Sequence, residues 1–262
     1  MQPESGRPGV MLVGAGPGAA DLLTVRALRA IEGAEALLYD ALVCDEVLNL
    51  APRRCLRIRT GKRAGGASMK QAEINALMLK LARRGLKVVR LKGGDPSVFG
   101  RSGEEKDYLE AHGVEVQVVP GVTAASAAAA QFGFPLTHRG EARRVTFATA
   151  RVQDGSVVED GWEAGADPET TLVLYMARDA AEAVTRRLIA EGRSPQTPAL
   201  AVENAGRPEA RLMPATLATL AAEVASRAPT GPVLLVIGPV AAQACDGRQV
   251  AAFTPQAVSR TA

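Results

Sequence analysis

The chain of 262 residues has few of the residue types that metal, disulfide and stacking sites require. Its three cysteines include no Cys-x-x-Cys pair, and with only two histidines no zinc-ligand spacing occurs. Aromatic residues make up 3%, so stacking surfaces for bases or sugars are scarce. These shortages predict a protein without a metal site and without a disulfide.

Long apolar runs and a strong charge excess are also missing. No stretch reaches the roughly 18–20 apolar residues of a membrane span. The first 18 residues, MQPESGRPGVMLVGAGPG, do not resemble a secretory signal, because an acidic residue and two prolines precede a short apolar run. We therefore expect a cytoplasmic protein without a membrane partner. A net charge of +3 argues against a nucleic-acid partner and suits a small acidic ligand better.

What is present is a globular composition, 47% hydrophobic and 23% charged, in which short β-type runs alternate with helical patterns. The first half predicts strands over 10–13, 36–39, 56–59, 87–91 and 114–118, and helices over 70–84 and 101–112. The second half restarts with a strand over 144–149. The pattern predicts two α/β domains with mostly parallel sheets, over 9–121 and 122–240, and a peripheral tail over 241–262.

The most informative stretch is VVRLKGGDPSVFGRSGEE, residues 88–105. An apolar run ends in Gly93, Gly94 and Asp95, and a charged helix opening follows. Glycine lets a ligand approach the backbone closely, and ligands of open α/β sheets bind outside the carboxyl ends of the strands. The stretch therefore predicts a ligand-binding turn, although taken alone an ordinary strand–helix turn accounts for it equally well.

A second glycine-rich loop, GAGPGA at 14–19, follows the first predicted strand, and Asp40 ends the next one. This is the skeleton of a dinucleotide-binding fingerprint, so an NAD-dependent oxidoreductase is one alternative. Pro17 argues against it, because it stiffens the loop where a pyrophosphate needs backbone amides. The fingerprint also gives no role to the GGDP turn. A non-catalytic ligand-binding protein on the same fold is a further alternative.

The order of motifs is distinctive: GAGPG, LLYD, GKRAGG, QAEIN, VRLKGGDPSVFGRSGEE, VVPGVTAA and PLTHR, followed by LVLYM and VEN. From about residue 9 to residue 240 it resembles the uroporphyrinogen-III C-methyltransferases of the tetrapyrrole methylase family. The resemblance implies that S-adenosyl-L-methionine methylates uroporphyrinogen III at ring carbons 2 and 7, giving precorrin-2 for sirohaem, cobalamin or haem d1 synthesis. Methylation of another precorrin is the nearest alternative.

The resemblance also implies a homodimer, with the active site in a trough between the two domains and S-adenosylhomocysteine as the second product. No NAD-binding dehydrogenase or chelatase module accompanies these motifs, so we expect the chain to stop at methylation. Carried over by position, the family's cofactor contacts fall on Pro17, Gly93, Gly94, Asp95, Val98, Thr123, Ala124, Met176 and Ala205.

For the chemistry, the resemblance points to Asp40 as proton acceptor and Lys62 as proton donor. Arg101 and Glu104 also match catalytic positions that face the substrate, and Arg101, Arg139 and Arg151 are the expected substrate-binding arginines. Because a guanidinium keeps its proton in proteins, we assign Arg101 to a substrate carboxylate. Glu104 is then either a base or the partner of Arg101.

The chain departs from the family pattern at several positions. Thr149-Ala150-Arg151 stands where Thr-Gly-His is usual, and Ala205 stands where glycine is usual. Ala67-Ser68 replaces His-Ser, and Ser97 replaces a bulky aromatic residue. These changes affect side chains around the substrate and remove no backbone contact to the cofactor.

Overall fold

The computed structural model describes residues 9–61, 69–149, 152–153, 156–157 and 162–245. The chain divides into two compact units, Met1–Thr123 and Ala124–Ala262, which are described separately below.

Unit 1 is built on a parallel five-stranded sheet with the order β3-β2-β4-β1-β5. The strands are β1 (Gly9–Gly14), β2 (Ala36–Tyr39), β3 (Leu56–Arg59), β4 (Val88–Lys92) and β5 (Glu115–Val119). The five strands predicted in this half are confirmed to within one residue at each end. Every residue of β4 is buried, as expected for a central parallel strand that is covered on both faces.

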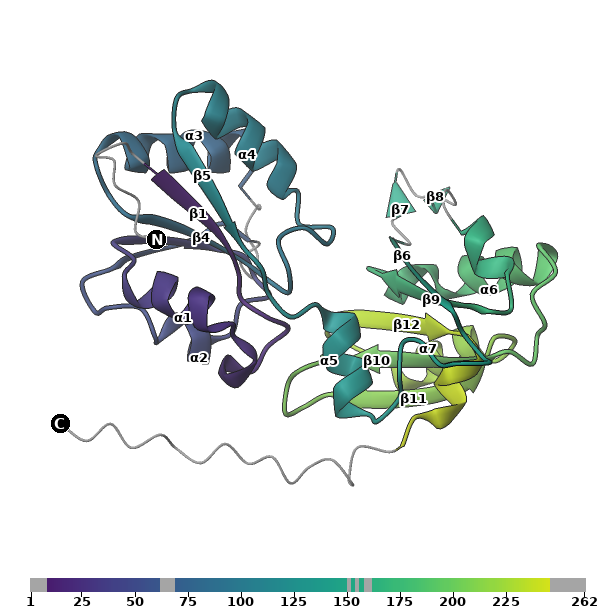
Figure 1. Cartoon of the computed structure of the whole chain (residues 1–262). Coiled ribbons are helices and arrows are strands. Elements are labelled where there is room, and N and C mark those ends of the chain that lie inside the picture. The colour runs from purple at the N-terminus through teal and green to yellow at the C-terminus, as the bar shows by residue number, and fades with distance from the viewer. Residues whose placement is uncertain (1–8, 62–68, 150–151, 154–155, 158–161, 246–262) are drawn as a thin grey trace, which may run out of the picture. The chain divides into compact units, whose positions relative to one another are not determined.

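Helices cover both faces of this sheet (Figure 1). One face packs against α1 (Val25–Glu32) and α2 (Asp45–Leu48), and the other against α3 (Gln71–Arg83) and α4 (Ser102–Ala111). The Thr24 hydroxyl caps α1 by accepting the Ala27 amide at 3.1 Å. The helices α3 and α4 lie within their predicted ranges, whereas α1, α2 and the short 3-10 helix η1 (Ala20–Leu22) were not predicted.

Unit 2 contains a second five-stranded sheet, with the order β11-β10-β12-β9-β6. Its strands are β6 (Arg144–Thr149), β9 (Thr170–Tyr175), β10 (Pro198–Glu203), β11 (Arg211–Thr216) and β12 (Val233–Ile237). Only β6 and β9 pair in parallel; the other three pairings are antiparallel. The prediction of a mostly parallel second sheet is therefore wrong. A short turn rather than a crossover helix joins β10 to β11, and such a turn forces an antiparallel pair.

Two layers also cover the second sheet. One face packs against α5 (Ala124–Gln131) and η4 (Pro239–Gln243), and the other against α6 (Ala181–Ala190) and α7 (Leu220–Arg227). The short elements η2 (Glu163–Ala166) and η3 (Arg178–Ala180) and the small pair β7 (Val152–Gln153) and β8 (Ser156–Val157) complete the unit.

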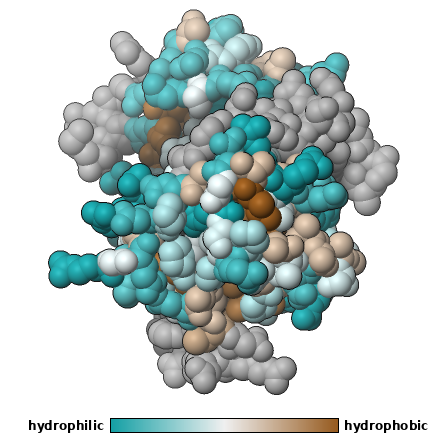
Figure 2. Space-filling model, turned by 90° about the vertical axis from the view of Figure 1, so that its right-hand side faces the viewer, coloured by the Kyte–Doolittle hydropathy of each residue, from teal (hydrophilic) through white to brown (hydrophobic). Residues whose placement is uncertain are grey.

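The start of the predicted peripheral tail is packed rather than peripheral. Ala241 is buried in the core beside α5, and the Cys245 amide donates to the Phe132 carbonyl at 2.9 Å. Residues 246–262 of the tail lie outside the described residues. In the part of the chain that the structure describes, every helix is too short or too polar to cross a membrane. Figure 2 shows a predominantly hydrophilic face on which hydrophobic residues form small patches.

Candidate functional site

The candidate site is the edge of the first sheet where the carboxyl ends of its parallel strands meet, which we call the edge loops. The loop after β1 contains GAGPG, the loop after β2 contains Asp40, and the loop after β4 contains GGDP. Pro120 and Gly121 follow β5. Ligands of open α/β sheets bind at this edge, so the structure brings together the motifs that the sequence singles out.

Backbone hydrogen bonds join the two glycine-rich loops. The Gly16 amide donates to the Gly94 carbonyl at 3.2 Å, and the Gly94 amide donates to the Gly16 carbonyl at 2.7 Å. A Cβ added to Gly14 would lie 2.6 Å from the Gly121 backbone, and one added to Gly121 would lie 2.3 Å from the Gly94 carbonyl oxygen. Only glycine permits backbones to approach this closely.

Gly94 differs from these tightly packed glycines. Its φ of +70° is unfavourable for residues with a side chain, but among the described residues an added Cβ would meet nothing closer than the Thr123 Cα at 3.9 Å. The turn is therefore open on this side. An open glycine between tightly packed neighbours is the feature expected of a backbone that a ligand approaches.

Asp95 ties the GGDP turn to the end of β5. One carboxylate oxygen accepts the Gly121 amide at 2.9 Å, and the other accepts the Ser97 amide at 2.7 Å and the Ser97 hydroxyl. The conformation of the turn is thus fixed by contacts of Asp95 within the protein. Its predicted cofactor contact stays a prediction.

Asp40 makes a similar tie from β2. Its Oδ1 accepts the Leu42 amide at 2.9 Å, and its Oδ2 accepts the Gly93 amide at 3.0 Å. Each oxygen has a second lone pair, so the carboxylate can accept a further hydrogen bond or a proton.

Lys62, the predicted partner of Asp40, lies outside the described residues. Gly61, which precedes Lys62, packs against Ala41, which follows Asp40. A Cβ added to Gly61 would lie 2.4 Å from the Ala41 nitrogen.

Arg101 and Glu104 form a two-pronged ion pair at the start of α4. Arg101 Nε and Nη2 donate to the two Glu104 oxygens, each at 2.7 Å, and both side chains are more than half exposed. The hydrogen bond from Arg101 lowers the pKa of Glu104, and the same bond raises the pKa of Arg101. This geometry favours Glu104 as the partner of Arg101 over Glu104 as a base.

Backbone strain gathers in the same loop. Phe99 and Arg101 both have left-handed backbones, with φ of +53° and +56°, which cost free energy for residues other than glycine. Such strain clusters at functional sites. Leu42 and Phe99 also expose large apolar side chains at this edge, a feature that the sequence prediction did not include.

In unit 2, the predicted cofactor residues Met176 and Ala205 follow the ends of β9 and β10. Met176 is 57% exposed with φ of +55°, and Asn204, which precedes the buried Ala205, has the same φ. Gln131 holds the loop after Asn204, because its side chain accepts the Gly206 amide and donates to the Arg207 carbonyl, each at 2.9 Å.

Glu203 fixes this end of β10 from inside the unit. Its Oε1 accepts the Thr230 and Gly231 amides, each at 2.7 Å, and its Oε2 accepts Arg211 Nε at 2.6 Å. Burial alone raises the pKa of Glu203, but the hydrogen bonds from Gly231, Arg211 and Thr230 outweigh burial, and the pKa lies below its ordinary value.

The remaining predicted residues are spread over the described parts of both units. Pro17 lies in the GAGPG loop, Val98 in the loop after β4, and Thr123 and Ala124 directly at the boundary between the units. Arg139 is exposed in the turn closed by the His138–Ala142 bridge. Arg151 lies outside the described residues.

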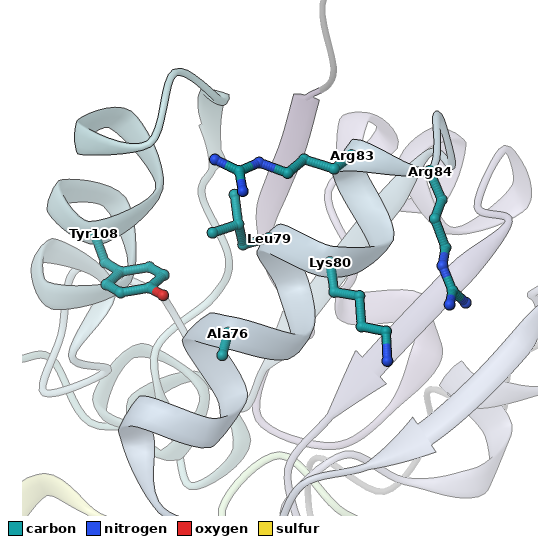
Figure 3. Close-up of a pocket in the computed structure, with 6 residues that line it drawn as sticks. All are labelled: Ala76, Leu79, Lys80, Arg83, Arg84 and Tyr108. Atoms are coloured by element: carbon teal, nitrogen blue, oxygen red, sulfur yellow. The ribbon is translucent and has the colours of Figure 1, made fainter.

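A pocket of about 380 Å³ lies elsewhere in unit 1, between α3 and α4 (Figure 3). It is lined by Ala76, Leu79, Lys80, Arg83, Arg84 and Tyr108. Its α3 residues belong to the last turns of that helix, directly before β4 begins. The pocket is thus at the opposite end of the sheet from the edge loops and is not the candidate site.

A parallel sheet with two interlocked glycine loops at its carboxyl edge, joined in sequence to a mixed α/β unit, defines a small-ligand protein of the α/β class. The model of the Tetrapyrrole (Corrin/Porphyrin) Methylases matches residues 9–221. The chain belongs to this family, and the resemblance inferred from its motifs is confirmed.

Two curated relatives show the extent of the likeness. A siroheme synthase from Stutzerimonas stutzeri is 47% identical over 231 residues, covering 88% of this chain and 50% of the relative. An S-adenosyl-L-methionine-dependent uroporphyrinogen III methyltransferase of Arabidopsis thaliana chloroplasts is 46% identical over 236 residues, covering 88% and 63%. The chain thus spans about half the length of the siroheme synthases that it matches.

A solved structure matches over nearly its whole length. It is the uroporphyrin-III C-methyl transferase of Thermus thermophilus, complexed with S-adenosyl homocysteine. The identity is 41% and the TM-score 0.76, with 88% of this chain and 98% of that chain covered.

The sheet order also argues against the NAD-dependent alternative. In a dinucleotide-binding fold the strand with the glycine loop and the strand with the acidic residue are neighbours, whereas here β4 lies between β1 and β2. The Gly16 amide, which a pyrophosphate would need, already donates to Gly94. The fingerprint match is therefore not a dinucleotide site.

Proposed function

We propose that this chain is an S-adenosyl-L-methionine-dependent methyltransferase that converts uroporphyrinogen III to precorrin-2 by methylation at ring carbons 2 and 7. The observation that supports this best is the pair of interlocked glycine loops with Gly94 open to a ligand. Family membership and the likeness to the Thermus thermophilus methyl transferase support the same reaction.

The residues of the edge loops fit the cofactor that this proposal requires. S-adenosylmethionine would supply an electrophilic methyl group, and its amino-acid end is both carboxylate and ammonium. The amides of Gly93 and Gly94 already donate within the protein, so the turn offers carbonyl lone pairs for the ammonium of such an end. The other proposed contacts are Pro17, Asp95, Val98, Thr123, Ala124, Met176 and Ala205.

The protein has little covalent chemistry to perform, because an electron-rich pyrrole carbon attacks the methyl group directly and positioning lowers the barrier. A proton must then leave the tetrapyrrole. Asp40 is the proposed acceptor, since its carboxylate lies at the edge loops and keeps free lone pairs. Lys62 is the proposed proton donor.

The substrate is rich in carboxylates, and the exposed fork of Arg101 is suited to one of them. Glu104 holds the guanidinium group of Arg101 in place until a substrate carboxylate competes for it. Arg139 and Arg151 are proposed as further carboxylate contacts. A homodimer is proposed on the family resemblance alone, and the cytoplasmic location stays an expectation from the sequence.

Two measurements test the proposal together. Calorimetric titration with S-adenosylhomocysteine should give micromolar or tighter binding, with NAD as the negative control. Anaerobic incubation of uroporphyrinogen III with S-adenosylmethionine should give a product that carries two added methyl groups. Binding without turnover of uroporphyrinogen III, but with methylation of precorrin-2, would replace this substrate by a later precorrin. Absence of S-adenosylhomocysteine binding at millimolar ligand would contradict the proposal altogether.

A further inference from the structure

Unit 1 contains a buried group of charged side chains that the proposed reaction does not use. Glu105, in the first turn of α4, has no exposed surface, and Arg90 and Lys92 of β4 are about 95% buried. Glu105 Oε1 accepts Arg90 Nε at 3.2 Å, and Oε2 accepts Lys92 Nζ at 2.7 Å. In the sequence, this buried group is indicated by two basic residues inside an otherwise apolar central strand.

The QAEIN motif at the start of α3 belongs to the same group. Gln71 Nε2 donates to Glu105 Oε1 at 3.1 Å and to the Oδ1 of the buried Asn75 at 2.9 Å. We call Gln71, Asn75, Arg90, Lys92 and Glu105 the buried polar cluster. It joins α3, β4 and α4, so two motifs that are distant in the sequence meet in one set of hydrogen bonds.

Stability alone does not explain this cluster. Buried ion pairs contribute little net stability, because desolvation of the charges offsets their attraction, and apolar residues of similar volume often do better. The cluster also contains two basic side chains but only one carboxylate. Burial lowers the pKa of Lys92, and the neighbouring Arg90 lowers it further, against the opposing effects of Glu105 and Asp40. Such an arrangement needs a reason in addition to folding.

The position of the Lys92–Glu105 pair provides that reason. Lys92 directly precedes the turn at Gly93, and Glu105 directly follows Glu104. A Cβ on Gly100 would lie 3.1 Å from Lys92 Cε, so the lysine side chain runs beneath the intervening loop. The Lys92–Glu105 pair therefore links the two ends of this loop, which runs from the glycine turn to the Arg101–Glu104 ion pair. We call this ion pair the Arg101–Glu104 fork.

The two ends of the loop are held by different contacts. Asp40 and Gly16 hold the glycine turn, and Asp95 ties it to Gly121. At the other end, Glu105 anchors the first turn of α4, which follows the strained Arg101. Loss of the Lys92–Glu105 pair should thus displace the fork while it leaves the glycine turn in place.

We propose that the buried Lys92–Glu105 pair, supported by Arg90 and Gln71, positions the Arg101–Glu104 fork relative to the glycine turn. This inference rests on the proposed function, because it assigns the fork to the substrate and the turn to the cofactor. Lys92 and Glu105 are positioning residues: they act through Arg101 and touch neither ligand.

The test compares Lys92→Met with Glu105→Gln, which keeps the shape of the side chain. Displacement of a positioned group by about 1 Å costs on the order of 10²-fold, so we expect kcat/KM for uroporphyrinogen III to fall about 10²-fold in Lys92→Met. S-adenosylhomocysteine affinity should stay within about threefold. Lys92→Arg, which keeps the cation, should recover part of the activity. The matched control is Lys106→Met, which removes an exposed ion pair with Glu110 in the same helix.

A double-mutant cycle separates positioning from a general structural role. In an Arg101→Ala background there is no fork to position, so Lys92→Met should cost less than about threefold. Equal costs in both backgrounds, a parallel loss of S-adenosylhomocysteine binding, or failure of both Lys92→Met and Glu105→Gln to fold would overturn the inference. A wild-type protein that does not turn over uroporphyrinogen III would instead overturn the proposed function.

Discussion

Substitution of Gly94 by valine isolates the role of the open glycine turn. With φ of +70°, Gly94 has a backbone conformation that costs a residue with a Cβ roughly 1–2 kcal/mol. Within the described ranges, the atom nearest to the added Cβ is the Thr123 Cα at 3.9 Å, so the variant should fold. Its two γ-methyl groups would project into the space that the ligand is proposed to use.

Gly85 offers a matched control in the same unit. It has a similar φ of +80°, and it lies at the turn between α3 and β4, away from the edge loops. A Cβ added to it would meet no atom within 4 Å in the part of the chain that the structure describes. Gly94→Val and Gly85→Val should both lower the free energy of unfolding by about 1–2 kcal/mol. Only Gly94→Val should lose S-adenosylhomocysteine binding, by at least about 100-fold in a calorimetric titration. Unchanged binding in Gly94→Val, or an equal loss in Gly85→Val, would refute the reasoning.

Four further substitutions test the other assigned roles. Arg101→Ala should weaken the use of uroporphyrinogen III by roughly 10- to 100-fold in KM while S-adenosylhomocysteine affinity is unchanged, because a carboxylate–guanidinium bond is worth about 1.5–3 kcal/mol; equal loss of both ligands would make Arg101 structural. Asp40→Asn should cut single-turnover methyl transfer by about 10²–10⁴-fold and Glu104→Gln by less; the reverse order would move the base to Glu104. Because Asp40 accepts two backbone amides, Asn at this position also leaves one donor unpaired, at a cost of about 1–3 kcal/mol of stability. The lowered pKa of Glu203 predicts stabilisation that is complete above the ordinary glutamate pKa of about 4.3 and is lost as pH falls through the lower folded pKa. Chemical denaturation should therefore show a gap between wild type and Glu203→Gln at pH 7 that shrinks toward pH 3, and a gap independent of pH would contradict this.

The first sheet could be predicted well because its inner strands β1, β2 and β4 are mostly buried runs rich in apolar residues, while the edge strands β3 and β5 alternate apolar with polar or charged residues. The helix α1 was missed although its buried residues Ala27, Ala30 and Ile31 have helical spacing, because the helix has only eight residues and that spacing is read over longer windows. The strand β11 contains Pro214, which favours an edge position and obscures the pattern. Strand direction in the second sheet depends on the connections between strands, which hydrophobic periodicity does not report.

The candidate site could be located from the sequence but its internal contacts could not. The glycine motifs identify the edge loops, because glycine has a direct backbone meaning. The carboxylates of Asp40 and Asp95 accept amides from other loops, and these contacts depend on which strands are neighbours. The pairing of Lys92 with Glu105 likewise depends on how α4 packs against β4. Tertiary contacts of this kind leave no local pattern in the sequence.

The central claim is methyl transfer to uroporphyrinogen III, and one measurement tests it directly. The wild-type chain is incubated anaerobically with uroporphyrinogen III and S-adenosylmethionine that carries a labelled methyl group, and the tetrapyrrole is analysed by mass spectrometry and carbon NMR. The account predicts two labelled methyl groups on each tetrapyrrole, at ring carbons 2 and 7, with two equivalents of S-adenosylhomocysteine released. An unlabelled tetrapyrrole, from protein that is folded and binds S-adenosylhomocysteine, would contradict it.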